Sequence, residues 1–294
     1  MERRIEFLIM EAMRVLVFCG YGINCEEETK AAFELAGAEA KIVHLKDAFM
    51  EKISIFDFDA IVFPGGFSFG DDLGAGRVLA NTLRHKRCGL GESLFKRLLI
   101  FLRSGGYILG ICNGFQVLTS LGLLPGLNDS FEQEASLESN DSGKFEDRWC
   151  NCVFPKNTST KILRGLGKIS LPVRHAEGKL VVKNRRIEQE IADRNLICMK
   201  YCDEKGNPTE VYPYNPNGSF MSCAGLSDPT GRVIGIMPHP EAFLSIYNHP
   251  NWGSVLRSDP GISREGAGLS FFKNFVYFAN KREKYDQASS YQRV

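Results

Sequence analysis

Four short apolar runs, each followed within three residues by glycine or proline, constrain the fold more than any other feature of the sequence. They are residues 14–19 (RVLVFC), 59–63 (DAIVF), 107–111 (YILGI) and 232–237 (RVIGIM). Between them lie stretches with helical spacing of apolar residues, at 26–36 and 92–103. Near-continuous apolar strands that alternate with helices are typical of a parallel sheet covered on both faces. The sequence therefore predicts an α/β fold.

The 294-residue length allows one large domain or two small ones. We see no internal repeat and no flexible linker, so we expect a single domain over residues 13–282, preceded by an N-terminal extension (1–12) and followed by a polar tail (283–294). Residues 244–268 form a segment too long for an ordinary connection. It is either a surface excursion or a docking loop for a partner, and the sequence favours neither.

Charge and hydropathy exclude several function classes. The 36 basic and 35 acidic side chains give a net charge of +1, whereas binding to nucleic acid or to an anionic membrane requires a basic excess. No run of about 18 apolar residues predicts a membrane span, and no targeting segment is recognisable. We expect a cytoplasmic protein without nucleic-acid or membrane partners.

The nine cysteines do not form a recognisable disulfide or zinc pattern. They are Cys19, Cys25, Cys88, Cys112, Cys150, Cys152, Cys198, Cys202 and Cys223. Structural zinc sites use paired C-x2-C knuckles or nearby histidine pairs, and neither spacing occurs here. We therefore expect no metal site, and interpret most cysteines as small buried residues in a reducing cytosol.

One cysteine stands in a pattern that indicates chemistry. In residues 106–116 (GYILGICNGFQ), Cys112 lies between Gly110 and Gly114, at the junction of an apolar strand and a helix. This G-x-C-x-G spacing corresponds to the G-x-S-x-G nucleophile elbow. A helix N-terminus stabilises a thiolate, and the N–H of Asn113 can donate to an oxyanion. The alternative is a buried cysteine in a tight glycine-rich turn.

A nucleophilic cysteine requires a base, and the base requires an acceptor that orients it. His239 follows the last apolar run in the segment 237–241 (MPHPE), whose prolines favour an extended path. In such a path the side chain of Glu241 projects to the same side as His239. The remaining histidines, His44, His85 and His249, are better explained as structural or solvated, and nothing in the spacing assigns a role to His175.

A glycine-rich loop, residues 64–76 (PGGFSFGDDLGAG), follows the second apolar run. Its glycines allow backbone N–H groups to approach a ligand closely. The loop lacks the Lys-Ser or Lys-Thr of a phosphate loop and does not match the dinucleotide fingerprint. We therefore interpret it as a second wall of the oxyanion and substrate site.

Together, these three segments resemble the class I (triad) glutamine amidotransferases. Supporting segments are 145–149 (FEDRW), 172–178 (PVRHAEG) and 215–219 (NPNGS), and the resemblance extends from about Met13 to about Phe243. It implies a flavodoxin-like, mostly parallel sheet with helices on both faces. It also implies hydrolysis of glutamine to glutamate and ammonia through a thioester, with the ammonia passed to a synthetase partner.

The resemblance assigns a role to each residue of a catalytic triad. Cys112 would attack the side-chain amide carbon of glutamine. His239 would protonate the leaving ammonia and then activate water against the glutamyl thioester, while Glu241 orients the imidazole.

The resemblance also implies the residues around the substrate. Backbone N–H groups of the Gly65, Gly66 and Phe67 segment and of Asn113 would stabilise the oxyanion, and Gln116 would contact bound glutamine.

The accessory segments resemble most the glutaminase subunits that serve the amidation of formylglycinamide ribonucleotide in purine biosynthesis. This implies glutamine and a synthetase large subunit as partners, and leaves a small accessory subunit open. It implies no cofactor in this subunit, with ATP and Mg²⁺ in the synthetase. Two alternatives remain: a class I amidotransferase for another acceptor, and a non-catalytic interaction module on the same fold. The intact Cys112, His239 and Glu241 disfavour the module.

Overall fold

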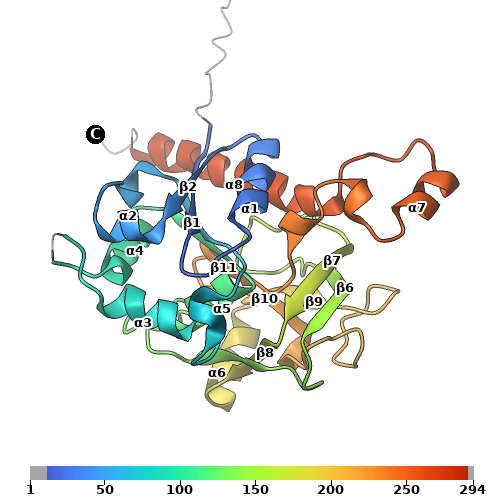
Figure 1. Cartoon of the computed structure of the whole chain (residues 1–294), viewed down its shortest axis with the longest axis horizontal. Helices are drawn as coiled ribbons and strands as arrows, with labels where there is room; N and C mark the ends of the chain where they lie inside the picture. The colour runs from blue at the N-terminus through green and yellow to red at the C-terminus, as the bar shows by residue number, and fades with distance from the viewer. Residues whose placement is uncertain (1–11, 90, 291–294) are drawn as a thin grey trace, which may run out of the picture.

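A computed structural model describes residues 12–89 and 91–290 and contains a nine-stranded sheet with helices around it (Figure 1). The strands are β1 (Arg14–Cys19), β2 (Glu39–His44), β3 (Ala60–Phe63), β4 (Tyr107–Ile111), β5 (Ala135–Ser139), β6 (Glu146–Val153), β7 (Ile169–His175), β8 (Glu177–Val182), β9 (Ile197–Tyr201), β10 (Cys223–Ser227) and β11 (Val233–Ile236). The α-helices are α1 (Glu26–Leu35), α2 (Leu45–Phe49), α3 (Arg77–His85), α4 (Leu94–Arg103), α5 (Asn113–Ser120), α6 (Arg185–Asp193), α7 (Trp252–Ser258) and α8 (Ala267–Ser290). Short 3₁₀ turns are η1 (Ile55–Asp57), η2 (Ser68–Asp71), η3 (Phe220–Ser222), η4 (Pro240–Ala242) and η5 (Ile246–Asn248).

The large sheet has a parallel half and an antiparallel half. Its strand order is β2-β1-β3-β4-β11-β10-β9-β6-β7. All pairs from β2 to β11 are parallel, whereas all pairs from β11 to β7 are antiparallel. The four apolar runs of the sequence are β1, β3, β4 and β11, which lie side by side and, with β2 at the edge, make up the parallel half. The predicted α/β fold is confirmed.

Helices cover both faces of the parallel half. Alternate residues of a strand point to opposite faces, so Tyr107 and Gly110 of β4 face opposite layers. The ring of Tyr107 contacts Phe275 of α8, with ring centroids 5.9 Å apart. A Cβ on Gly110 would lie 2.6 Å from backbone atoms of Gly114 in α5. Therefore α5 lies on one face and α8 on the other, as predicted for a doubly covered sheet.

A second, two-stranded sheet of β5 and β8 lies below the large sheet in Figure 1. Strand β5 lies within the polar, acid-rich residues 128–144, where no apolar run predicts a strand. Its apolar residues alternate with polar ones, and Leu137 is buried while its neighbours are not. The short alternating pattern is weak in a polar segment, and this explains why the strand was missed.

The structure also revises the predictions for the C-terminal part of the chain. The predicted loop at 244–268 contains η5 and α7, and α7 projects from the body of the molecule in Figure 1. The closing helix α8 continues to Ser290, so residues 283–290 of the predicted polar tail are helical. Residues 291–294, and residues 1–11 of the predicted extension, lie outside the described residues.

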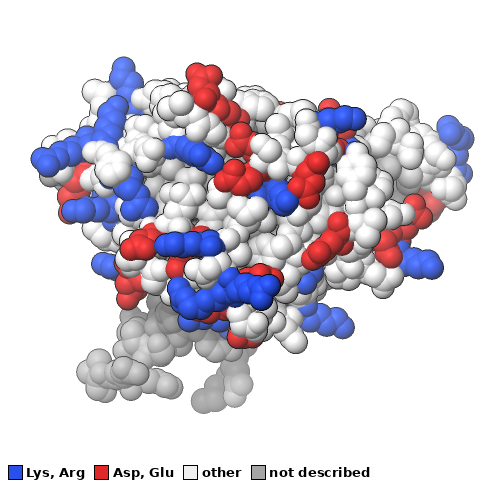
Figure 2. Space-filling model, turned by 90° about the horizontal axis from the view of Figure 1, so that it is seen from below, with Lys and Arg blue, Asp and Glu red and all other residues white. Residues whose placement is uncertain are grey.

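Basic and acidic side chains are interspersed on the face shown in Figure 2, in agreement with the net charge of +1. Within residues 12–89 and 91–290, no helix combines the length and apolar character needed to cross a bilayer.

Candidate active site

The predicted catalytic segments converge at one edge of the sheet. Strands β1, β3, β4 and β11 are adjacent and parallel, so the loops that follow them leave from the same edge. These loops carry Cys25, the Gly65-Gly66 pair, Cys112 and His239. The carboxyl ends of strands are where open α/β sheets place their sites. The topology therefore brings together residues that are more than 200 positions apart in sequence.

The turn at Cys112 has the geometry of a nucleophile elbow. Cys112 adopts φ 50° and ψ −103° between β4 and α5. A Cβ on Gly114 would lie 1.9 Å from the carbonyl oxygen of Phe63, which leaves no room for a side chain. A strained backbone conformation at a non-glycine residue persists only where its surroundings hold it. Here the N–H of Cys112 donates to Ile236 O at 2.7 Å, which fixes the elbow to β11.

His239 and Glu241 form a buried hydrogen-bonded pair. Nδ1 of His239 lies 2.6 Å from Oε1 of Glu241, and both side chains are about 3% exposed. Burial lowers the pKa of His239, but the Glu241 carboxylate and the Cys112 thiol raise it more, and the net pKa lies well above the ordinary value. An imidazolium beside a cysteine at a helix N-terminus favours the nucleophilic thiolate.

Strand β7 holds both catalytic segments through its backbone. The N–H of His239 donates to Pro172 O at 2.9 Å, and Sγ of Cys112 lies 3.5 Å from Arg174 O. These two carbonyls belong to alternate residues of one strand. A single strand of the antiparallel half thus sets the distance between the base segment and the nucleophile.

Two segments, the loop after β3 and the N-terminus of α5, have backbone N–H groups available for an oxyanion. Within the described residues, those of Gly66 and Asn113 donate to no protein acceptor. The N–H of Phe67, in contrast, donates to Gly22 O at 2.8 Å, and its side chain is 46% exposed. The backbone N–H of Phe67 is thus used by the antiparallel bridge between Ile23 and Gly66, and the predicted place of Phe67 in the substrate and oxyanion wall stays a prediction. Gly66 itself has φ 149° and lies too close to this bridge for a side chain.

Gly65 packs against the imidazole of His239, the predicted base. A Cβ at this position would lie 2.7 Å from Cε1 of His239 and 3.2 Å from Sγ of Cys25. The absence of a side chain at Gly65 is therefore what allows the imidazole to pack against the loop after β3.

Hydrogen bonds of Asn113 and Gln116 connect α5 with the loop after β3 and with the turn after β7, which together form one wall of the site. Asn113 Nδ2 donates to Gln116 Oε1 at 2.9 Å, and Gln116 Nε2 donates to Glu177 O at 2.6 Å. Asn113 also accepts from the N–H of Ser68 at 3.2 Å. Both ends of the Gln116 amide are thus in contact with the protein, and its predicted contact with glutamine stays a prediction.

Two acidic residues of this wall were not found from the sequence. Asp71 Oδ1 accepts from Asn113 Nδ2 at 3.3 Å, and Glu177 Oε2 accepts from the N–H of Ala75 at 3.0 Å. Burial and the nearby Glu177 raise the pKa of Asp71 to about 6. Both acidic residues lie within segments that carry recognisable motifs, but only the fold shows that the segments meet.

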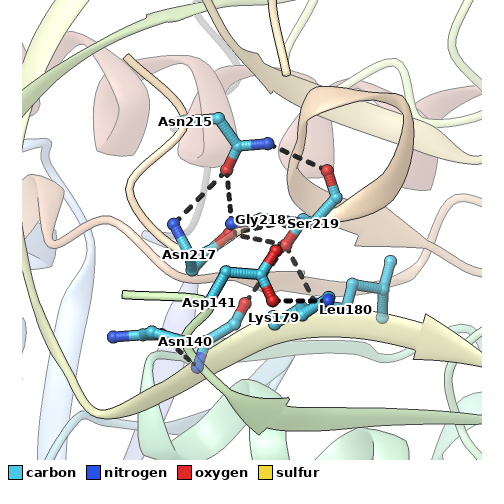
Figure 3. Close-up of polar contacts among 9 residues, drawn as sticks. Asn140, Asp141, Lys179, Leu180, Asn215, Asn217, Gly218 and Ser219 are labelled. Carbon is cyan, nitrogen blue, oxygen red and sulfur yellow. Dashed lines mark hydrogen bonds and ion pairs between the residues drawn. The ribbon is translucent and has the colours of Figure 1, made fainter. Parts of the chain in front are cut away.

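A polar network joins the segment 215–219 to Asn140 and to strand β8 (Figure 3). Asn140 donates from Nδ2 to the carbonyl of His175 at 2.8 Å and accepts on Oδ1 from the N–H of Gly178 at 3.0 Å. Ser219 Oγ accepts from Leu180 N and donates to Gly178 O. The network therefore fixes the turn between β7 and β8, which carries Glu177. The segment 215–219 contributes to the site through this turn.

His175, which the sequence left without a role, is a buried member of the same network. Its Nδ1 lies 3.1 Å from Asn140 Oδ1, and the side chain is 2% exposed. Burial, assisted by the nearby His239, lowers the pKa of His175 to about 3. His175 is therefore a neutral structural residue at physiological pH.

Cys25, in the loop after β1, was also not found from the sequence. One potential ligand atom from each of Cys25, His239 and Glu241 lies within 4.8 Å of the other two. In the described part of the chain this is the one group of histidine, cysteine and acidic residues so arranged. The position of Cys25 in the loop after β1 is the signal that could have placed it at the edge of the sheet where the site forms.

Comparison with known proteins identifies the family. The sequence profile of the CobB/CobQ-like glutamine amidotransferase domain matches residues 12–279. The chain belongs to this family. The sequence is 40% identical over 289 residues to phosphoribosylformylglycinamidine synthase subunit PurQ of Methanococcus maripaludis, covering 93% of this chain and 100% of that protein. It is 40% identical to the protein of the same name from Dehalococcoides mccartyi, covering 92% and 100%.

Other members of the glutamine amidotransferase family extend the comparison. Phosphoribosylformylglycinamidine synthase of Drosophila melanogaster is 34% identical over 254 residues, but the match covers 18% of that longer protein. Among solved structures, a chain of PurLQS from Thermotoga maritima has a TM-score of 0.64 and 26% identity, covering 91% of this chain and 99% of that one. A glutamine amidotransferase from the same organism, 13% identical with a TM-score of 0.51, shares the fold.

Proposed function

We propose that this chain is the glutaminase subunit of a phosphoribosylformylglycinamidine synthase. The observation that carries the proposal is the convergence of Cys112, His239 and Glu241 at one sheet edge, with free backbone N–H groups beside them. The relatives that match over their full length are named as subunits of that enzyme. The reaction is hydrolysis of glutamine, and the ammonia serves the conversion of formylglycinamide ribonucleotide to formylglycinamidine ribonucleotide.

The first half of the reaction forms a thioester. The thiolate of Cys112 attacks the side-chain amide carbon of glutamine, and the amide oxygen takes the negative charge. The N–H groups of Gly66 and Asn113 are placed to donate to that oxygen. When the C–N bond breaks, the imidazolium of His239 gives its proton to the leaving nitrogen, and ammonia departs.

The second half releases glutamate. The now neutral imidazole of His239 takes a proton from a water molecule, and the resulting hydroxide attacks the thioester carbon. The C–S bond breaks, and the thiolate of Cys112 is regenerated beside the imidazolium. Glu241 keeps Nδ1 protonated through the 2.6 Å hydrogen bond and stabilises the charged ring in both halves.

The proposal assigns the remaining chemistry to a partner. Glutamine and a synthetase large subunit are the partners, and the proposal leaves a small accessory subunit open. In support, the similar chain from Thermotoga maritima is part of a structure of PurLQS. The proposal places ATP and Mg²⁺ at the synthetase and no cofactor in this chain. It also places the chain in the cytoplasm, supported by nine cysteines that are all free thiols, as in a reducing compartment.

Ammonia release from glutamine, measured with and without the purified synthetase subunit, tests the proposal. We expect glutaminase activity that increases when the synthetase, ATP and formylglycinamide ribonucleotide are present. If the synthetase leaves glutamine hydrolysis unchanged while an enzyme for another acceptor stimulates it, the pathway assignment is wrong.

A further inference from the structure

Cys25 is a thiol beside the catalytic base that the proposed mechanism does not use. Its loop is tied to the site because the N–H groups of Asn24 and Cys25 both donate to Gly65 O, at 3.1 and 3.2 Å. The side chain is half-buried, and its Sγ lies on the same side of Gly65 as the imidazole of His239. The thiol is therefore held at the site by backbone contacts on both sides of it.

The groups around Cys25 include a buried polar atom without a protein partner. The imidazole of His239 interacts with the thiols of Cys112 and Cys25, whereas Oε2 of Glu241 is buried and accepts no hydrogen bond in the described part of the chain. Unpaired buried polar atoms are costly and call for an explanation, which a bound group can supply. A thiol, an imidazole and a carboxylate, each offering an atom within 4.8 Å of the others, are arranged around a common space.

We propose that Cys25, His239 and Glu241 form a binding site for Zn²⁺, and that its occupation inhibits the enzyme reversibly. Zinc binds thiolate, imidazole and carboxylate groups at about 2.0–2.3 Å in a tetrahedral arrangement, so small side-chain movements within the 4.8 Å cluster suffice. Binding releases two protons to solvent, one from the Cys25 thiol and one from the His239 imidazolium, and the second leaves a ring lone pair for the metal.

The donor set favours a borderline transition metal over the abundant hard cations. Mg²⁺ and Ca²⁺ prefer six or more oxygen ligands, whereas this cluster offers one carboxylate, one nitrogen and one sulfur. A zinc ion with three protein ligands keeps a fourth position. The thiol of Cys112 interacts with the same imidazole and is a fourth ligand compatible with the proposal.

Zinc binding inhibits the reaction because His239 cannot be a zinc ligand and the proton-transfer group at the same time. An imidazole that coordinates zinc through a ring nitrogen cannot transfer protons to ammonia and from water. This part of the inference rests on the proposed function, whereas zinc binding itself does not. The two parts are therefore tested separately.

Direct binding is measured first, in a Cys112→Ala background that removes the nucleophile as a ligand. Zinc is titrated by equilibrium dialysis in a thiol-free reductant, and Co²⁺ replaces it to reveal sulfur-to-metal charge-transfer absorption. We expect one equivalent to bind, and Cys25→Ser in this background to weaken binding by about 100-fold or more, since loss even of an outer-shell partner costs 10–100-fold. Cys19→Ser, at another partly exposed cysteine, is the matched control and leaves binding unchanged.

Activity is measured second, in the otherwise wild-type chain with its synthetase. Cys25→Ser retains glutamine hydrolysis without zinc, but requires about 10-fold or more higher Zn²⁺ for half inhibition, again from the loss of a ligand. Equal zinc affinity in the Cys112→Ala and Cys112→Ala/Cys25→Ser chains, with both folded by circular dichroism, would overturn the site. Zinc bound at Cys25 without any inhibition would overturn the regulatory part alone. Absence of glutaminase activity in every chain would contradict the proposed function and leave the binding result intact.

Discussion

The parallel half of the sheet places reactive side chains in the site, whereas the antiparallel half contributes mainly backbone groups. The loops after β4 and β11 carry Cys112 and His239, whereas β7 offers the carbonyls of Pro172 and Arg174 to them. Local motifs therefore predict the nucleophile and the base, whereas the distance between Cys112 and His239 is set by β7, a strand that is far from both in sequence.

This division predicts that a backbone defect in the parallel half has the largest effect. Gly114→Ala puts a Cβ 1.9 Å from Phe63 O, so we expect a destabilisation of more than about 4 kcal/mol and loss of glutaminase activity. Gly167→Ala, at an exposed glycine with no atom within 4 Å, changes stability by less than about 0.5 kcal/mol. Chemical denaturation of both variants checks the contrast, and equal stabilities would contradict the steric account of the elbow.

The buried histidine of the antiparallel half predicts a pH dependence of stability. Because the pKa of His175 is lowered from 6.5 to about 3, the unfolded chain binds this proton first as pH falls. Its contribution to stability is full above about pH 6.5 and is lost progressively down to about pH 3, by about 4 kcal/mol. The raised pKa of His239 adds no slope in this window, since its contribution is fully present below 6.5.

The free energy of unfolding of the wild type and of His175→Asn, measured between pH 6.5 and 4, isolates this contribution. We expect the free energy of unfolding of the wild type to fall more steeply with decreasing pH than that of the variant. The difference in slope corresponds to the uptake of about one additional proton on unfolding. Parallel curves would show that His175 takes up a proton in the folded state.

A smaller effect is expected from removing the hydrogen bonds of Asn140, which hold the turn between β7 and β8 in the antiparallel half. Asn140→Ala leaves the carbonyl of His175 and the N–H of Gly178 without a partner, which costs about 1–3 kcal/mol. Because the turn that carries Glu177 loosens, we expect KM for glutamine to rise more than kcat falls. Lys179→Ala, at the exposed rim of the network, removes an ion pair to Asp141 worth about 1 kcal/mol or less and is the control. A loss of kcat alone in Asn140→Ala would contradict a positioning role.

The smallest effect is expected at Phe67. Its N–H is already used and its side chain is exposed, so Phe67→Ala is expected to change stability by less than about 0.5 kcal/mol. Its glutaminase kinetics should match those of the wild type. A large rise in KM for glutamine would place the Phe67 side chain in the substrate wall.

Sequence alone predicted the parts of the site that local motifs encode. Cys112 and its glycines, and the His239–Glu241 pair, each lie within five consecutive residues, and strand-end position follows from apolar runs. The contacts of Arg174 O, Glu177 and Asn140 could not be predicted, because they depend on the pairing of β6 with β7 and of β5 with β8, which no short pattern specifies. Cys25 was missed for the same reason: its neighbour His239 is 214 positions away.

The central claim is that Cys112 produces the ammonia that a synthetase partner consumes. Its most direct test is the complex of Cys112→Ala with the synthetase, supplied either with glutamine or with an ammonium salt, with formylglycinamidine ribonucleotide as the measured product. We predict that glutamine-dependent synthesis falls by about 10⁴-fold or more, while ammonium-dependent synthesis stays at the wild-type rate. Glutamine-dependent synthesis at the wild-type rate would contradict the account.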